Sequence, residues 1–287
     1  MIEMSEKKKV AVITGGGSGM GLEAAKFMSR EKIIVLSGRT QSKLEKGVAE
    51  LKSLGFEAWA KTCDTSVRES VGALAQYAAS LGEVTNVINA AGISPSMAGS
   101  TAENLLRINA LGTAYINQEF YKVMHGGSAI LDVSSCSAYF APDDPAVLEA
   151  FGLIDTDDAA CLKAMVKLCG ENDVDPQLAA GRSPYIMSKK FVIWYARKCA
   201  FAYADKGVRV VSLSPGMIDT PMGEAEKTSS EMLVSMTASK RMGSAAELGY
   251  ALAAAVDERN GYLTAVDVLC DGGSIMGMAN MMAQAQK

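Results

Sequence analysis

The chain has 287 residues, of which 49% are hydrophobic and 21% charged, and its 28 basic and 32 acidic residues give a net charge of −4. This composition is typical of a folded globular protein and excludes a chain that is disordered throughout. The acidic balance, interrupted only by a short basic run at residues 7–9, excludes the basic face that nucleic acid requires.

The apolar runs are strand-sized and fall short of the ~20 residues that a membrane span needs. Residues 1–6 lack the charged-then-apolar order of a signal peptide. The six cysteines are scattered without paired spacing, and the single histidine, His125, precedes two glycines in a turn. We therefore expect a cytoplasmic protein with reduced thiols, without a metal site or His-based triad, and without membrane or nucleic-acid partners.

Apolar runs alternate with helical patterns along the first half of the chain. We expect strands at residues 10–13, 33–36, 58–62, 84–89 and 129–133. We expect helices at residues 22–29, 42–54, 67–81 and 101–124. Continuous rather than alternating apolar runs are typical of buried parallel strands. The series predicts an α/β fold with a Rossmann-type, doubly wound parallel sheet.

The alternation breaks at an acidic, polar stretch of about residues 138–183. Helical patterns lie inside this stretch at residues 146–151 and 156–168. Beyond it we expect helices at residues 185–205 and 245–256 and strands at residues 208–213 and 265–269. No repeat or low-complexity linker divides the chain, so we expect a single domain over residues 1–287 that carries one insertion.

The first expected strand runs into a glycine-rich turn, Thr14-Gly-Gly-Gly-Ser-Gly-Met-Gly21, and then a helix. Small residues let the backbone approach a pyrophosphate, and free N–H groups at a helix start attract its charge. The spacing of Gly15, Gly19 and Gly21 differs by one residue from G-x-G-x-x-G. A nucleotide site is the prediction, and an ordinary strand–helix turn is the alternative.

The end of the second expected strand carries no carboxylate to bind a ribose hydroxyl, as an NAD site would require. The sequence there is Leu36-Ser-Gly-Arg-Thr40, and Arg39 could pair with a 2′-phosphate instead. This favours NADP, with NAD possible. The alternative is a surface arginine that caps the turn.

Tyr185 and Lys189 are four residues apart and would share one face of a helix. A free phenol titrates near pH ~10, and a neighbouring cation lowers that pKa. The pair could therefore transfer a proton at neutral pH, although the same spacing occurs by chance on many surface helices.

Together these elements resemble the short-chain dehydrogenase/reductase family over nearly the whole chain. The turn at residues 14–21 is similar to the family's cofactor loop, residues 89–92 to its N-N-A-G element, and residues 271–273 to its closing D-G-G. The resemblance implies a Rossmann fold and a nicotinamide cofactor. The residues it implies for cofactor binding are Gly15, Ser18, Gly19, Met20, Gly21, Arg39, Thr40, Asp64, Thr65, Asn89, Ala90, Tyr185, Lys189, Ile218 and Thr220.

The resemblance also implies a catalytic tetrad of Asn109, Ser135, Tyr185 and Lys189. Tyr185 would carry the proton and Ser135 would hydrogen-bond the reacting oxygen. Lys189 would lower the pKa of Tyr185 and reach the cofactor ribose. Asn109 would hold a water that links the lysine to solvent.

Two features depart from the common family pattern. Residues 262–266 read Tyr-Leu-Thr-Ala-Val, where family members commonly have a glycine. The separation of Ser135 and Tyr185 is unusually long, and the inserted segment resembles that of the bacterial 3α-hydroxysteroid dehydrogenase/carbonyl reductases. In those relatives the insertion changes how subunits associate, which implies a homo-oligomer, a dimer or tetramer. The alternative is an acidic surface excursion without a functional part.

Methionines crowd the segments after Pro215 and at the C-terminus, where they could fit a bulky apolar ligand or simply fill a core or interface. We therefore expect an NADP-preferring oxidoreductase that interconverts a secondary alcohol and a ketone, with a hydroxysteroid or bile acid as leading substrate. The alternatives are a general carbonyl or 3-oxoacyl reductase and, in another class, a non-catalytic dinucleotide-binding sensor.

Overall fold

The computed structural model describes residues 7–170, 175, 179, 181–219 and 234–285. Within these residues, seven parallel strands form one sheet in the order β3-β2-β1-β4-β5-β6-β9. The strands are β1 (Lys9–Thr14), β2 (Ile33–Gly38), β3 (Glu57–Thr62), β4 (Glu83–Asn89), β5 (Ala129–Val133), β6 (Arg209–Pro215) and β9 (Asp267–Cys270). A short separate ladder joins β7 (Ile218–Asp219) to β8 (Gly243–Ser244).

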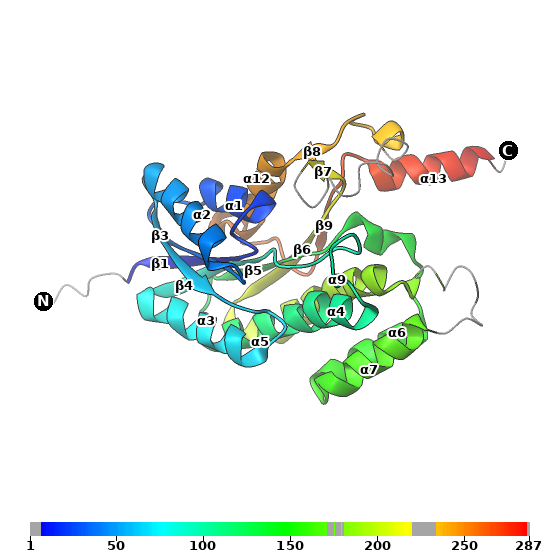
Figure 1. Cartoon of the computed structure of the whole chain (residues 1–287), viewed down its shortest axis with the longest axis horizontal. Coiled ribbons are helices and arrows are strands. Elements are labelled where there is room, and N and C mark those ends of the chain that lie inside the picture. The colour runs from blue at the N-terminus through cyan, green and yellow to red at the C-terminus, as the bar shows by residue number, and fades with distance from the viewer. Residues whose placement is uncertain (1–6, 171–174, 176–178, 180, 220–233, 286–287) are drawn as a thin grey trace, which may run out of the picture.

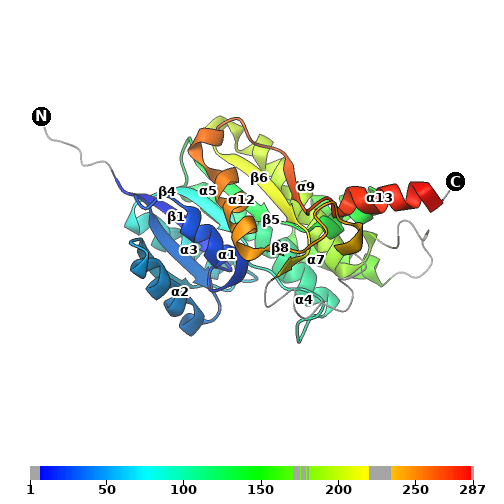
Figure 2. The ribbon, with the colours of Figure 1, turned by 90° about the horizontal axis from the view of Figure 1, so that it is seen from above.

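Helices cover both faces of the sheet, as the views in Figure 1 and Figure 2 show. One face carries α1 (Gly19–Phe27), α2 (Gln41–Ser53) and α12 (Ala245–Val256). The other carries α3 (Arg68–Leu81), α5 (Gly112–Val123) and α9 (Pro184–Ala202). Each face has its own apolar core, because the strand residues are buried on both sides. The predicted doubly wound Rossmann-type fold is therefore confirmed.

The single helix expected at residues 101–124 consists of three parts. These are α4 (Ala102–Leu106), a π-helical turn (Arg107–Leu111) and α5. A π-turn accommodates one extra residue in a helix and is frequent at functional sites. Asn109, which the sequence places in the candidate site, lies inside this turn.

The inserted segment folds into α6 (Pro145–Gly152) and α7 (Asp158–Cys169), close to the two expected helical patterns. In Figure 1 the two helices lie on the outer side of α4 and α9. Phe151 of α6 is fully buried against Phe191 and Trp194 of α9, with ring centroids 5.1 and 5.5 Å away. This buried face shows that α6, the first helix of the segment, packs into the core of the domain.

Polar contacts also attach the insertion to the domain. A buried ion pair joins Asp144, at its start, to Arg182, at its end, with 2.8 Å between Nε and Oδ2. The carboxylate of Asp158 accepts hydrogen bonds from Tyr115 (2.8 Å) and Arg68 (3.3 Å). The described part of the insertion therefore has fixed positions at both ends and in its middle.

The C-terminal region differs from the sequence expectation in two ways. The last strand begins at Asp267 rather than at residue 265, because Ala265 has a φ of 57°. This left-handed conformation favours glycine, which is the residue that the family commonly has in this segment. A helix that the sequence did not predict, α13 (Ser274–Ala285), follows and projects from the body of the molecule (Figure 1).

Candidate active site

Two cavities meet at the carboxyl edge of the sheet, where the strand order reverses between β1 and β4. One has a volume of about 250 Å³ and the other about 240 Å³. They share the lining residues Met20, Ala90, Gly92 and Ile93, so they form two ends of one cleft. The reversal point of a doubly wound sheet is where such folds bind ligands.

The glycine-rich turn forms the floor of the first cavity. Gly15 has a φ of 66°, and a Cβ at this position would lie 2.6 Å from the backbone oxygen of Ala90. Only glycine fits this close approach between the ends of β1 and β4. The turn then enters α1 at Gly19, whose free N–H groups face an incoming anion. The turn therefore fits the predicted pyrophosphate site.

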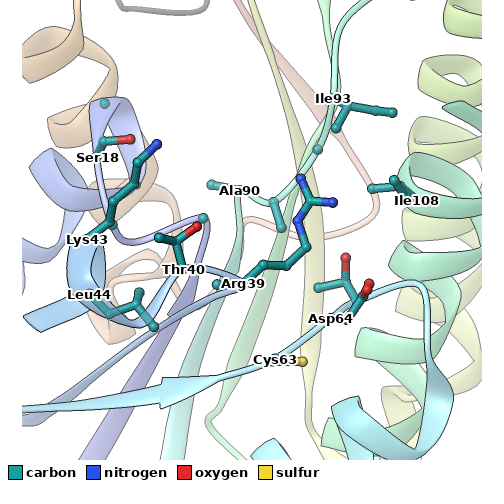
Figure 3. A pocket seen from close by; sticks show the side chains of 18 of the residues that line it. Ser18, Arg39, Thr40, Lys43, Leu44, Cys63, Asp64, Ala90, Ile93 and Ile108 are labelled. Atoms are coloured by element: carbon teal, nitrogen blue, oxygen red, sulfur yellow. The ribbon is translucent and has the colours of Figure 1, made fainter. Parts of the chain in front are cut away.

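Cationic side chains lie at the turn between β2 and α2. Arg39 and Thr40, which we expect to bind the cofactor, both line the first cavity. Lys43, in the first turn of α2, also lines it and was not predicted. In Figure 3 Arg39 and Lys43 lie on either side of Thr40. Of the described lining residues Asp64 alone is acidic, so this end of the cavity suits a phosphate group.

The side wall of the first cavity comes from the end of β3. Asp64 and Thr65, which we also expect to bind the cofactor, line it. The Asp64 Oδ1 atom accepts hydrogen bonds from the backbone N–H (3.0 Å) and the hydroxyl (2.6 Å) of Ser66. These bonds hold the carboxylate in one orientation at the cavity wall (Figure 3).

The second cavity contains Ser135 at the end of β5. The preceding Ser134 is 2% exposed and donates its hydroxyl to the backbone oxygen of Lys189 at 2.7 Å. Ser135 Oγ accepts from the backbone N–H and the hydroxyl of Ser137, at 3.2 and 3.0 Å. Since both bonds use Ser135 Oγ as the acceptor, its own O–H remains able to donate to a substrate oxygen.

Tyr185 and Lys189 both lie in α9 and line the same cavity as Ser135. The Lys189 ammonium is 5.8 Å from the centroid of the Tyr185 ring and donates to the backbone oxygen of Val133 at 3.1 Å. Burial lowers the pKa of Lys189 to about 8, against the attraction of Asp132. The lysine is thus a desolvated cation beside the phenol, and its field acts strongly there.

Asn109 lies behind the cleft rather than on its lining. Its Oδ1 accepts from the backbone N–H of Ile93 at 2.9 Å, and its Nδ2 donates to the backbone oxygen of the same residue at 3.0 Å. Nδ2 also donates to Ser188 at 3.2 Å. A Cβ on Gly92 would lie 3.1 Å from Asn109 Oδ1 and 3.6 Å from Lys189 Nζ. The asparagine and the lysine therefore meet at one glycine.

The remaining predicted residues occupy different places. Ala90 and Ile218 line the cleft. Asn89 does not line either cavity and instead bonds Thr14 and Asp132 beneath it. Thr220 lies outside the described residues. Sequence reasoning missed Asp132, which lies in an apolar strand run. Its hydrogen bonds from Asn89 and Asn117 become visible only in the structure.

Comparison with known proteins identifies the family. The sequence model of the family described as short chain dehydrogenase matches residues 9–142. The family model described as Enoyl-(Acyl carrier protein) reductase matches residues 174–274. A short-chain dehydrogenase/reductase of Alternaria brassicicola, bsc3, is 30% identical, over 92% of this chain and 94% of that protein. The chain belongs to the short-chain dehydrogenase/reductase family. It is an oxidoreductase that acts on alcohol- or ketone-type substrates.

Other relatives agree with this membership. A cyclohexanol dehydrogenase of an Acinetobacter species is 27% identical, over 94% of this chain and 96% of that protein. A short-chain dehydrogenase from Burkholderia cenocepacia, solved in complex with NADP, shares the fold with a TM-score of 0.74. It is 22% identical and the alignment covers 94% of this chain and 98% of that one. Residues 143–173, which lie between the two family matches, contain α6 and α7.

Neither a membrane-spanning helix nor a metal cluster is found among the described residues. No helix among them has both the length and the apolar character needed to cross a membrane. No group of three or more histidine, cysteine, aspartate or glutamate side chains in the described ranges could hold a metal ion.

Proposed function

We propose that this family member is an NADP-preferring enzyme that interconverts a secondary alcohol and a ketone on a bulky apolar substrate, with a hydroxysteroid or bile acid as the leading candidate. One observation carries the proposal. Ser135, Tyr185 and Lys189 line one end of a cleft whose other end is formed by the glycine-rich turn and Arg39. A proton-transfer pair therefore adjoins a cavity whose turn and cations suit a nucleotide.

The first cavity fits the nucleotide part of NADP. The turn at residues 15–21 would hold the pyrophosphate, and Asp64 and Thr65 would contact the adenine end. Arg39 and Lys43 would pair with the 2′-phosphate, the feature that distinguishes NADP from NAD. When bound, the nicotinamide supplies or accepts the hydride.

The residues of the second cavity would handle the proton. In ketone reduction Tyr185 donates its phenolic proton to the substrate oxygen, and in alcohol oxidation it takes that proton back. The Lys189 cation stabilises the phenolate that is left. Ser135 donates to the same oxygen and fixes its position. Asn109 holds the Ile93 backbone and faces the lysine across Gly92, where a relay to solvent could begin.

The chemistry of the cavity supports an uncharged, apolar substrate. Lys189 is the only charged residue among the described residues that line it. Three of the methionines noted in the sequence, Met217, Met242 and Met278, are part of the wall, whereas Met276, Met281 and Met282 are exposed and do not line it. A flexible apolar wall of this kind adapts to a ring system. One relative is a cyclohexanol dehydrogenase by name, which supports a cyclic alcohol.

The alternatives differ in what the cleft would need. A 3-oxoacyl reductase would require cations at the cavity mouth for an acidic carrier, and the described lining offers none besides Lys189. A non-catalytic sensor would have no use for the serine, tyrosine and lysine together. A general carbonyl reductase differs only in the breadth of its substrates, so a substrate panel must distinguish it.

The test is a panel of hydroxysteroid ketones, oxo bile acids, cyclohexanone and a 3-oxoacyl thioester, followed by NADPH absorbance. We expect the highest kcat/KM with a polycyclic ketone, and NADPH preferred over NADH. Tyr185→Phe should remove turnover and retain NADPH binding, because the ring and its packing remain. Turnover that survives in Tyr185→Phe would contradict the catalytic assignment, and NADPH binding without any turnover in the natural protein would favour the sensor.

A further inference from the structure

A row of buried polar side chains crosses the central sheet directly below the cleft. The strand register aligns Thr14 of β1 with Asn89 of β4, and Asn89 with Asp132 of β5. The row continues to Ser212 of β6. Residues aligned in this way point to the same face of a sheet. These four are at most 3% exposed, at positions where buried parallel strands normally carry apolar side chains.

At the centre of the row is a carboxylate whose two oxygens are both held by amides. Asn89 Nδ2 donates to Asp132 Oδ1 at 3.0 Å, and Asn117 Nδ2 of α5 donates to Oδ2 at 2.8 Å. Thr14 donates to Asn89 Oδ1 at 2.8 Å and so fixes which amide group faces the carboxylate. Amide donors favour the ionised form. The two amides therefore favour a negative charge on Asp132, which makes no direct ion pair with another described residue.

The opposite charge for this carboxylate is the Lys189 ammonium. Its Nζ is bonded to the backbone oxygen of Val133, the residue that follows Asp132 in β5. Asp132 is fully buried and Lys189 is 6% exposed, so water screens their attraction little. Burial raises the pKa of Asp132 to about 7, against the amide bonds and the attraction of Lys189. Burial lowers the pKa of Lys189 to about 8, and Asp132 opposes that change.

Two buried ionisable side chains near the pair, Cys199 and Tyr203, are neutral at physiological pH. Burial, with a smaller contribution from the charge of Asp132, raises the pKa of the Cys199 thiol of α9 to about 12. Burial, followed by the neighbouring Cys199 and Tyr195, raises the pKa of Tyr203, just beyond α9. Tyr185 faces Lys189 from one turn earlier in α9. Among the described residues, Asp132 is thus the charge that offsets the desolvation of the lysine.

We propose that Asp132 is a positioning residue that keeps the Lys189 ammonium protonated beside Tyr185, held in place by Asn89 and Asn117. The role deepens the proposed function and rests on it, because the lysine charge matters there for proton transfer. Without the carboxylate, the Tyr185–Lys189 pair loses a proton more readily. The two groups titrate together, so the change belongs to the pair rather than to either side chain.

The first experiment compares Asp132→Asn with Asp267→Asn. The row extends one strand further, from Ser212 to Asp267 of β9, which is also a buried carboxylate. Asp267 accepts hydrogen bonds from Ser212 (2.6 Å) and Tyr139 (2.7 Å). The pH dependence of ketone reduction is measured between about pH 6 and pH 10. In Asp132→Asn the alkaline limb of kcat/KM should move down by about one pH unit. In Asp267→Asn it should not move.

A uniform loss of activity in Asp132→Asn, with an unmoved alkaline limb, would overturn the proposal and leave a purely structural role. A second variant, Asn117→Ala, keeps the carboxylate and removes one donor that favours its charge. It should move the limb in the same direction by a smaller amount. If Asp132→Asn does not fold, an unmoved limb in Asn117→Ala overturns the proposal.

A measurement without turnover separates this inference from the proposed function. Because the folded-state pKa of Asp132 is raised, natural protein loses stability as pH rises from the ordinary carboxylate range to about 7. Asp132→Asn lacks this loss, so its Tm relative to the natural protein should rise between about pH 4 and about pH 7. A Tm difference that is independent of pH would contradict the buried charge, whereas failure of every substrate would contradict only the proposed function.

Discussion

The hydroxyl of Ser134 donates to the backbone oxygen of Lys189, 2.7 Å away, and so joins the end of β5 to the middle of α9. This bond holds the lysine-bearing turn of the helix against the strand whose next residue, Ser135, faces the cleft. Two adjacent serines therefore have separate tasks, one in support and one toward the substrate.

The first prediction separates the two serines. Ser135→Ala should lower kcat by about 10²–10³-fold, because it removes a donor to the reacting oxygen, while Tm and NADPH affinity stay unchanged. Ser134→Ala should instead lower the free energy of unfolding by about 1 kcal/mol, with a smaller effect on kcat. Steady-state kinetics and thermal unfolding of both variants test this. The reverse pattern would assign the substrate contact to Ser134.

A second prediction concerns cofactor preference. Arg39→Asp should weaken NADPH binding by about 10–100-fold, since a charge-assisted bond to the 2′-phosphate is replaced by repulsion, and should leave NADH binding nearly unchanged. Lys43→Asp should act in the same direction. The matched control is Lys46→Asp, the same charge change at an exposed α2 position that does not line the cavity. Equal effects at all three positions would indicate only a change in net charge.

A third prediction tests how firmly the insertion belongs to the core. Phe151→Ala should lower the free energy of unfolding by about 3–5 kcal/mol, because its ring is fully buried against α9. Phe201→Ala, at a side chain that is 79% exposed, should change it by less than about 0.5 kcal/mol. Chemical denaturation of the two variants measures the difference. A small effect at Phe151 would restore the surface-excursion interpretation.

A fourth prediction extends this to association, where we propose a homo-oligomer. Replacing residues 143–180 by a short loop removes α6 and α7 and uncovers apolar surface on α4 and α9. Exposed apolar surface of this kind drives association. Light scattering should therefore report a different oligomer from that of the full chain. An unaltered mass, with retained folding, would show that these helices do not influence association.

A fifth prediction concerns the backbone before β9. Ala265→Gly should raise the free energy of unfolding by up to about 1 kcal/mol, because alanine pays a steric cost at a φ of 57° that glycine avoids. Gly55→Ala provides the opposite case, with a φ of 87° and open space around the added methyl. Gly55→Ala should lower the free energy of unfolding by about 1 kcal/mol through backbone strain alone. A destabilised Ala265→Gly would mean that the alanine methyl contributes packing.

Much of the fold follows from patterns that act locally. Buried strands show as apolar runs, and α12 begins where expected because Ser244 and Glu247 form a reciprocal cap. The helix α13 was missed although Asp271 provides a signal, since its carboxylate accepts from the backbone N–H of Ile275 and from Ser274. Its methionines suggested a ligand or an interface and obscured the helical pattern.

The candidate site likewise contains residues that local sequence patterns predict and residues that they do not. Spacing predicts that Tyr185 and Lys189 share a helix face, and the structure places them in one cavity with Ser135. The contributions of Lys43 and Asp132 depend on which residues the fold brings near them, and no local pattern contains that information. Asn109 could be placed in a helix, but no local pattern predicts the π-turn that surrounds it.

That π-turn has a consequence for the shape of the whole helix. One extra residue rotates the following segment by about 100° around the helix axis relative to an uninterrupted α-helix. The two halves can therefore present differently oriented sides to their neighbours, α4 to α7 and α9, and α5 to α3 and β4. One continuous helical segment therefore packs against neighbours in two different directions. The change of direction occurs at the π-turn that contains Asn109, the residue that faces Lys189.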